Sequence, residues 1–156
     1  MTRRSWALLA AIAVALGVAG AGWYNADEHH RRDVAVRQST AAANAAAQAI
    51  FSYDYRSFDA SVANGKGFTT GDFADEYAQT TAALKSNAVA EQAIVRASVS
   101  ATGVVTATAS RVELLLYVDQ YRRNANITGE KVDQNRVVLT MIPIAGAWKV
   151  SHAIAV

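Results

Sequence analysis

The chain has 156 residues, of which 52% are hydrophobic and 18% charged, with one proline, no cysteine and a formal net charge of +2. This length allows one ordinary domain of roughly 100 to 150 residues and excludes two large ones. The absence of thiols excludes a scaffold built on disulfides or on cysteine-bound zinc.

The positive net charge comes from the first residues of the chain. Arg3 and Arg4 precede the first apolar run, whereas the residues after Tyr24 contain 13 basic and 13 acidic side chains. The body of the protein is therefore formally neutral. It also lacks the basic surface with interleaved aromatic residues that nucleic-acid binding requires, so we expect no nucleic-acid partner.

The first predicted element is a membrane anchor. Residues 5–24 carry no charge, and as an α-helix they would span about 30 Å, the thickness of the hydrocarbon core of a bilayer. Trp6, Trp23 and Tyr24 stand where interfacial aromatic residues are found. Because positive residues favour the cytoplasmic side, we predict residues 1–4 as a cytoplasmic tail and residues 5–24 as a transmembrane helix.

The same segment also fits a cleaved signal peptide. A charged start and an apolar run up to Val18 are followed by the small residues Ala19, Gly20 and Ala21, which resemble a cleavage site. The apolar run continues past this site into an aromatic pair, which favours an uncleaved anchor. Under either interpretation the rest of the chain is exported from the cytoplasm.

A helical stalk or first helix is predicted for residues 25–50, and an exported domain for residues 51–156. Residues 33–51 contain no glycine or proline and are rich in alanine, the strongest helix former. Ala41, Ala45 and their neighbours do not make a large apolar stripe. We therefore expect this helix to pack closely through small side chains.

Two further helices are predicted after this one. The first covers residues 53–63 and is expected to end at the Asn-Gly pair of residues 64–65. Asp72 is the expected N-cap of the second, with Asp75 and Glu76 in the first turn, where the helix dipole favours acidic residues. Helical spacing is shared by five residues of this second helix: Phe73, Tyr77, Thr80, Thr81 and Leu84.

The pattern then changes to the period of two that is typical of strands. Apolar and polar residues alternate over residues 94–101, and Thr102 with Gly103 is expected to end that strand. Residues 104–108 are expected to form either a short return strand or the end of a bulged one, and further strands are predicted over residues 111–121, 134–143 and 148–153, with a turn at 145–146. Helices followed by an antiparallel meander of three or four strands make an α+β domain with the helices packed on one face of a curved sheet.

Five blocks of sequence carry a family resemblance. They are SYDYRSFD at residues 52–59, GKGFTTGDFADEY at 65–77, GVV at 103–105, RVELLLYVDQ at 111–120, and RVVLTM with GAWKVS between 136 and 151. In order and spacing these blocks, which cover about 100 residues, resemble the Mce-associated membrane proteins of actinobacteria. Those proteins are encoded with mammalian-cell-entry (Mce) lipid-import systems.

The resemblance implies a fold, a location and a function. The fold would be a nuclear-transport-factor-like cone, and the protein would be a single-pass protein of the cell envelope. Its function would be that of a non-catalytic accessory or stabilising subunit of an Mce-type lipid or sterol import system. Its partners would be Mce and permease subunits, with residues 5–24 in the membrane.

No arrangement of residues predicts a metal or phosphate site. His29 and His30 are adjacent, so on a helix they point about 100° apart and need a third ligand, which Asp27 or Asp33 could supply. A solvated collar next to the membrane is the simpler interpretation. The Gly-Lys-Gly sequence at 65–67 lacks the spacing and the following Ser or Thr of a phosphate-binding loop, so we interpret it as a turn.

The acidic residues have structural explanations. Asp54 and Asp59 lie about 140° apart around a helix, which is poor geometry for a catalytic pair. Asp54 with Tyr53 and Arg56 fits a network at a helix start, and the acids at residues 72, 75 and 76 fit capping and the helix dipole. We therefore predict no catalytic residue, no metal ligand and no cofactor.

Two alternatives remain open. One is a small isomerase-like or dehydratase-like enzyme in which His152, the only histidine of residues 51–156, or Asp54 acts as a general base. The other is an apolar-ligand binding module. Seven of the ten aromatic residues in the body fall within residues 51–77, where helices must meet the sheet, and packing in the core is their simpler role. If the faces leave a cavity, the same residues would line an apolar pocket suited to a lipid or sterol.

Overall fold

The computed structural model describes residues 27–156 in full and, for residues 3–26, only the course of the backbone. The elements, in chain order, are α1 (Arg3–Ile50), β1 (Tyr53–Asp54), a 3-10 turn (Tyr55–Ser57), α2 (Phe58–Lys66), α3 (Asp72–Ala90), β2 (Ile94–Ala107), β3 (Val112–Arg123), β4 (Lys131–Ile144) and β5 (Ala147–Ala155). Among the described residues no helix is long and apolar enough to cross a membrane. The predicted cytoplasmic tail and transmembrane helix, residues 1–4 and 5–24, lie outside the fully described part of the chain.

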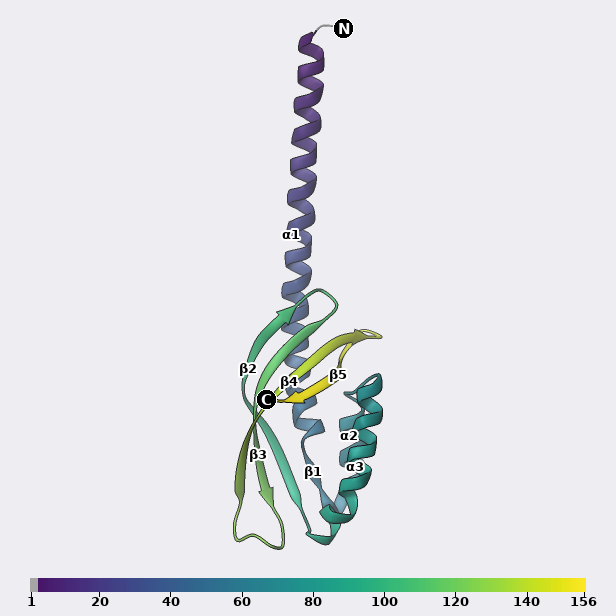
Figure 1. The fold of residues 1–156 in the computed structure, drawn as a ribbon, viewed down its shortest axis with the longest axis vertical. Helices are drawn as coiled ribbons and strands as arrows, with labels where there is room; N and C mark the ends of the chain where they lie inside the picture. Colours follow the sequence, from purple (N-terminus) through teal and green to yellow (C-terminus); the bar gives the residue numbers. More distant parts are fainter. Residues whose placement is uncertain (1–2) are drawn as a thin grey trace.

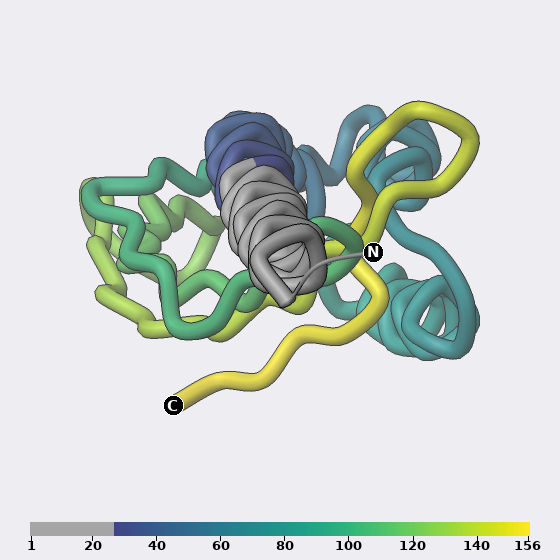
Figure 2. The backbone as a smooth tube through the Cα atoms, turned by 90° about the horizontal axis from the view of Figure 1, so that it is seen from above, coloured from purple at the N-terminus to yellow at the C-terminus, as the bar shows by residue number. Residues whose placement is uncertain are grey.

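The strands form one antiparallel sheet in the order β1-β2-β3-β4-β5, so each strand pairs with its neighbours in sequence (Figure 1). The C-terminal part of α1 packs across the sheet, and α2 and α3 lie beside each other on one side of it (Figure 2). The predicted α+β class, with helices packed on a curved antiparallel meander, is confirmed.

The face of α1 that meets the sheet consists of small side chains. Six residues of this face are buried: Ala35, Ser39, Ala43, Ala46, Ala47 and Ile50. The sheet supplies the large partners, because Leu114, Leu116, Leu139 and Met141 are all fully buried. Burying a side chain of this size stabilises a fold by about 1.5–3 kcal/mol. The prediction of close packing through small side chains is confirmed, although Ala41 and Ala45 are exposed and the contact face lies elsewhere on the helix.

Two hydrogen bonds hold α1 at the two edges of its contact with the sheet. The Thr102 hydroxyl lies 2.7 Å from Oδ1 of Asn44, which joins β2 to the helix. Nε1 of Trp148 donates to Oε1 of Gln38 at 3.3 Å, which joins β5 to the helix a little under two turns earlier. The helix is thereby fixed both along its length and across the sheet.

The boundaries of α2 differ from the prediction. Tyr53 and Asp54 pair with Val95 and Ile94 as β1, so the helix begins only at Phe58. It also continues through the predicted stop at Asn64 and Gly65 to Lys66.

Gly65 has a packing role inside α2. A Cβ atom at this buried position would lie 2.1 Å from the Tyr77 hydroxyl oxygen and 3.0 Å from the carbonyl oxygen of Ala49. The glycine therefore lets α2 approach both α3 and α1, and the prediction that it ends a helix is wrong.

The start of α3 and the course of β2 also require corrections. The residue before α3 is Gly71, at a φ of 60°, and no side chain caps the helix, so Asp72 is its first residue and not its N-cap. Thr102 and Gly103 do not interrupt β2, which runs unbroken to Ala107. Its register shifts twice, between Val99 and Ala101 and between Val104 and Thr106. Such bulges bend a strand while its pairing continues, which suits a sheet that curves around α1.

The small-residue face of α1 yields a direct test. Ala46→Leu adds bulk where the helix meets the fully buried sheet residues, and overpacking of this kind costs about 1–3 kcal/mol. Ala41→Leu makes the same change on the exposed face of the same helix and should change stability by less than about 0.5 kcal/mol. Thermal and chemical unfolding of the two variants measures the difference. Equal stability would show that the helix does not pack as described.

Candidate functional site

Residues 51–54, called the crossing segment below, lead from the end of α1 into β1 (Tyr53–Asp54), the edge strand of the sheet. Hydrogen bonds hold this crossing segment in place: the Ala97 backbone N–H donates to Oγ of Ser52 at 2.8 Å, and Nε2 of Gln120 donates to the Phe51 carbonyl oxygen at 3.2 Å. Asn135 in turn donates to Oε1 of Gln120 at 2.8 Å. A cavity lies on each side of the segment, and Ser52 and Tyr53 line both.

The first cavity, called the apolar cavity below, has a volume of about 370 Å³. It lies between α3 and α2 on one side and strands β3, β4 and β5 on the other, with the end of α1 closing it. Its aromatic and large aliphatic lining includes Phe51, Tyr53, Phe58, Phe73, Tyr77 and Leu84. Five of the seven aromatic residues in the 51–77 stretch therefore face one cavity.

The sequence builds this cavity from two patterns. The helical spacing in α3 places Phe73, Tyr77, Thr80, Thr81 and Leu84 on its inner face, as predicted. On the opposite wall β5 alternates, so that Ala153 and Ala155 line the cavity whereas His152 and Ile154 do not, although Ala155 is itself exposed. Two alanines opposite a row of aromatic residues leave space that larger side chains would have filled.

The polar groups of the apolar cavity are mostly uncharged. Tyr53 and Phe58 pack edge to face, with ring centroids 5.5 Å apart. Burial raises the pKa of Tyr53, and Glu91 adds to this while Arg122 opposes it. Burial also raises the pKa of Tyr77. Both phenols therefore stay neutral at physiological pH. Glu76 is the one charged residue that lines the cavity in the described part of the chain.

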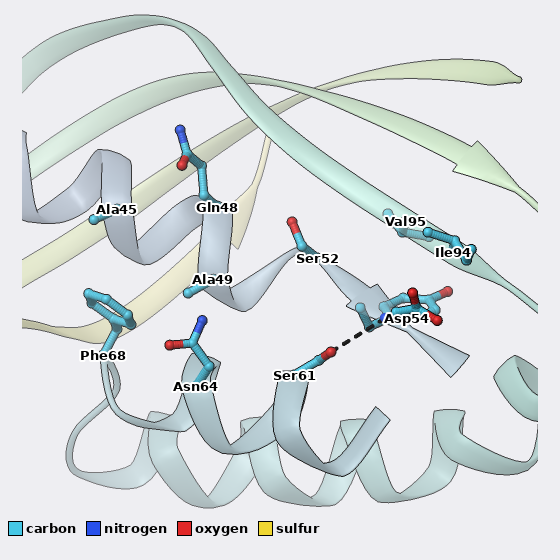
Figure 3. Close-up of a pocket in the computed structure, with 11 residues that line it drawn as sticks. Ala45, Gln48, Ala49, Ser52, Asp54, Ser61, Asn64, Phe68, Ile94 and Val95 are labelled. Carbon is cyan, nitrogen blue, oxygen red and sulfur yellow. Dashed lines mark hydrogen bonds between the residues drawn. The ribbon is translucent and has the colours of Figure 1, made fainter. Parts of the chain in front are cut away.

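The second cavity, called the polar cavity below, has a volume of about 420 Å³ and opens between α1, α2 and the start of β2 (Figure 3). The side chains of Gln48, Ser61 and Asn64 line it. The Asp54 backbone N–H donates to Oγ of Ser61 at 3.4 Å, which is the bond drawn in Figure 3. Polar groups from two helices thus face a shared opening.

Asp54 lies at the edge of the polar cavity, and its carboxylate is held by Arg56. Oδ1 accepts from the Arg56 backbone N–H at 2.9 Å and from its Nε at 2.9 Å, while Oδ2 accepts from Nε at 3.1 Å. These bonds to Arg56 lower the pKa of Asp54 to about 2. Asp54 caps the 3-10 turn that leads into α2, so the predicted network at a helix start is confirmed.

The other residues singled out in the sequence do not form a catalytic site. Asp59 pairs with Lys85 at 2.7 Å, a bridge from α2 to α3, and not with Asp54. His152 is exposed, on the face of β5 opposite the apolar cavity. His29 and His30 are exposed on α1, and the described residues contain no group of three side chains able to hold a metal ion.

Some residues of the site have no counterpart among the sequence predictions. Ser52 and Gln120, which fix the crossing segment, look in the sequence like ordinary polar residues at element ends. Ala153 and Ala155 look like part of a generally alanine-rich chain. The alternation of alanines with His152 and Ile154 is the one signal that could have placed them on an inward face.

The chain matches no protein-family model and no curated protein. Its fold is similar to those of solved structures, among them the following three. An IcmL-like type IV secretion system protein from Legionella pneumophila has 16% identity and a TM-score of 0.63, over 80% of this chain and 90% of that one. The periplasmic domain of DotI has 15% identity and a TM-score of 0.62, over 74% and 90%. VirB8 of Agrobacterium tumefaciens has 10% identity and a TM-score of 0.61, over 75% and 88%.

The TM-scores of 0.61–0.63, each over most of both chains, show that the fold is shared with these three proteins. The nuclear-transport-factor-like cone that the family resemblance implies stays a prediction. None of the three is an Mce-associated protein. The prediction that the chain is not an enzyme agrees with the first of these structures, which is named as a type IV secretion system protein.

The Asp54–Arg56 contact makes a prediction about titration. Because the folded-state pKa of Asp54 is about 2, below the ordinary 3.8, the contact contributes stability above pH 3.8 that is lost as the pH falls through about 2. Carboxyl ¹³C NMR should show the Asp54 midpoint near 2, and Arg56→Ala, which removes the side-chain bonds but keeps the backbone N–H donor of residue 56, should raise it towards 3.8. Lys85→Ala removes the other ion pair of α2 and should leave this midpoint unchanged. A midpoint near 3.8 in the unmodified protein would contradict the assigned contact.

Proposed function

We propose that the protein is a membrane-anchored, non-catalytic subunit that stabilises a transport assembly of the cell envelope. The observation that carries this proposal is the fold, which matches a VirB8 protein and the periplasmic domain of DotI over most of their lengths. The direction of the chain is consistent with it, since α1 enters the domain from the predicted anchor. On this proposal the N-terminus is cytoplasmic and the domain extracytoplasmic.

The finer proposal is that the assembly is an Mce-type lipid or sterol importer. It rests on the five sequence blocks, which fall on structural positions that shape the domain. The block at residues 65–77 begins at Gly65 and ends at Tyr77, the two residues whose contact lets α2 meet α3. The block at residues 52–59 contains the crossing segment and the Asp54 cap. The partners would then be Mce and permease subunits.

The geometry gives little support to the enzyme alternative. A general base must reach the proton that it removes. His152 faces away from the apolar cavity, and Asp54, with a pKa of about 2, is too weak a base to remove a proton from a neutral substrate. A stabilising subunit needs neither group.

Co-purification from native membranes tests the proposal. A tagged full-length chain, extracted in mild detergent, should recover Mce and permease subunits. The Ala41→Leu variant should recover the same proteins, because its substitution lies on an exposed face. Ala46→Leu should recover fewer, because the domain that binds them is destabilised.

Each other outcome has a clear meaning. Recovery of the chain alone would overturn the proposal of an assembly subunit. Recovery of secretion or other transport subunits would keep the assembly role and remove the Mce assignment. If the Ala46→Leu variant recovers as many partner subunits as the unmodified chain at a temperature where the variant is unfolded, the folded domain is not the part that binds them.

A further inference from the structure

We propose that the apolar cavity binds an uncharged lipid that carries a hydroxyl group, either a sterol or a long-chain alcohol. The proposal concerns a ligand of the domain, and it holds whether or not the protein belongs to an Mce assembly.

The size and lining of the cavity point to a ligand. Its volume of about 370 Å³ falls within the range of roughly 300–1,000 Å³ that small-molecule sites occupy. Protein interiors are close-packed and contain few voids larger than a water molecule. At about 30 Å³ per water, the cavity would hold on the order of a dozen waters, and its aromatic walls would offer them few hydrogen bonds. An apolar molecule suits this space better.

The walls are fixed rather than loosely placed. Phe58 is 4% exposed, and Tyr77, Ile50 and Val137 are each 7% exposed, so these four lining residues are held by packing against the rest of the fold. Tyr77 is held in place where its ring end contacts Gly65 of α2. The cavity therefore exists before a ligand enters, and binding need not order its walls.

The charge of the lining selects among lipids. Glu76 is exposed and lines the cavity, which places its carboxylate at the mouth. Within residues 27–156 no lysine, arginine or histidine lines this cavity, and the Lys85 ammonium is engaged by Asp59 on the outer side of the helices. A fatty-acid carboxylate or a phosphate head group would meet a like charge there and no partner of opposite charge.

The same residues favour a hydroxyl group. Thr80 is exposed and lies one helical turn after Glu76 on α3, so the two side chains are neighbours at the mouth. A ligand hydroxyl could donate to the Glu76 carboxylate while its apolar body fills the cavity. Hydrogen bonds to a charged group are stronger than those between neutral groups, so this contact would also orient the ligand.

Photo-crosslinking of the full-length protein in lipid nanodiscs tests the proposal. The probes are a long-chain alcohol, a fatty acid of the same chain length and a sterol, each with a diazirine, and crosslinked peptides are mapped by mass spectrometry. The alcohol or the sterol should label peptides from α3 and β5. Labelling by the fatty acid should be about tenfold weaker because of the charge at the mouth. The hydroxyl probe that labels these peptides more strongly shows whether the ligand is a sterol or a long-chain alcohol.

A charge reversal gives the matched control. Glu76→Lys should reverse the preference towards the fatty acid, whereas Asp75→Lys makes the same change on the neighbouring residue, which does not line the cavity, and should leave the preference unchanged. A second pair of variants tests whether the probe occupies the cavity. Ala153→Phe fills the cavity and should abolish labelling, while Ile154→Phe on the opposite face of β5 should not.

The outcomes decide the proposal. If Ala153→Phe fails to fold by circular dichroism, Thr80→Trp blocks the mouth from α3, with Gln79→Trp as its control. Labelling confined to peptides outside α3 and β5, or labelling unchanged by the blocking variant, would overturn the cavity as the site. Equal labelling by acid and alcohol, unaffected by Glu76→Lys, would overturn the ligand class.

Discussion

The domain depends on the close approach of α1 to the sheet. A helix whose inner face is alanine and serine brings its backbone near the sheet, and the large buried side chains then come from the strands. The positions of Ala43, Ala46 and Ala47, each 0% exposed, leave no room for a larger residue. This packing also explains why β2 bends through two bulges, since a flat strand could not follow the helix.

The placement of α1 decides where space remains. The helix fills the part of the sheet under its last turns and then ends at Ile50, before the far ends of β4 and β5. From there α2 and α3 cover the sheet, with α2 in contact with β1 and α3 in contact with β5, and aromatic side chains line the space between them and the sheet. The apolar cavity lies between the part of the sheet that α1 covers and the part that α2 and α3 cover. A stabilising role and a ligand site are therefore compatible in one domain, because the first uses its fold and the second its interior.

Much of the fold follows from patterns that act over short distances. The strand patterns over residues 111–121, 134–143 and 148–153 predicted β3, β4 and β5, and the helical spacing from Phe73 to Leu84 predicted the inner face of α3. The errors fall where tertiary contacts override local preference. Gly65 has the local character of a helix stop but lies inside α2 in contact with Tyr77, and Tyr53, predicted as the first residue of a helix, pairs with Val95 as part of β1. The sequence did not decide whether a cavity exists, since aromatic residues at 51–77 fit a filled core equally well.

Hydrogen exchange of the full-length chain tests most directly whether the end of α1 belongs to the core of the domain. Amides that open only when the whole domain unfolds exchange at one shared free energy. If the account is correct, the amides of residues 43–50 exchange with the same free energy as those of residues 114–118 in β3, and Ala46→Leu lowers both together. If residues 43–50 exchange through a separate local opening while β3 stays protected, the helix is an attached stalk, and the account of the core is wrong.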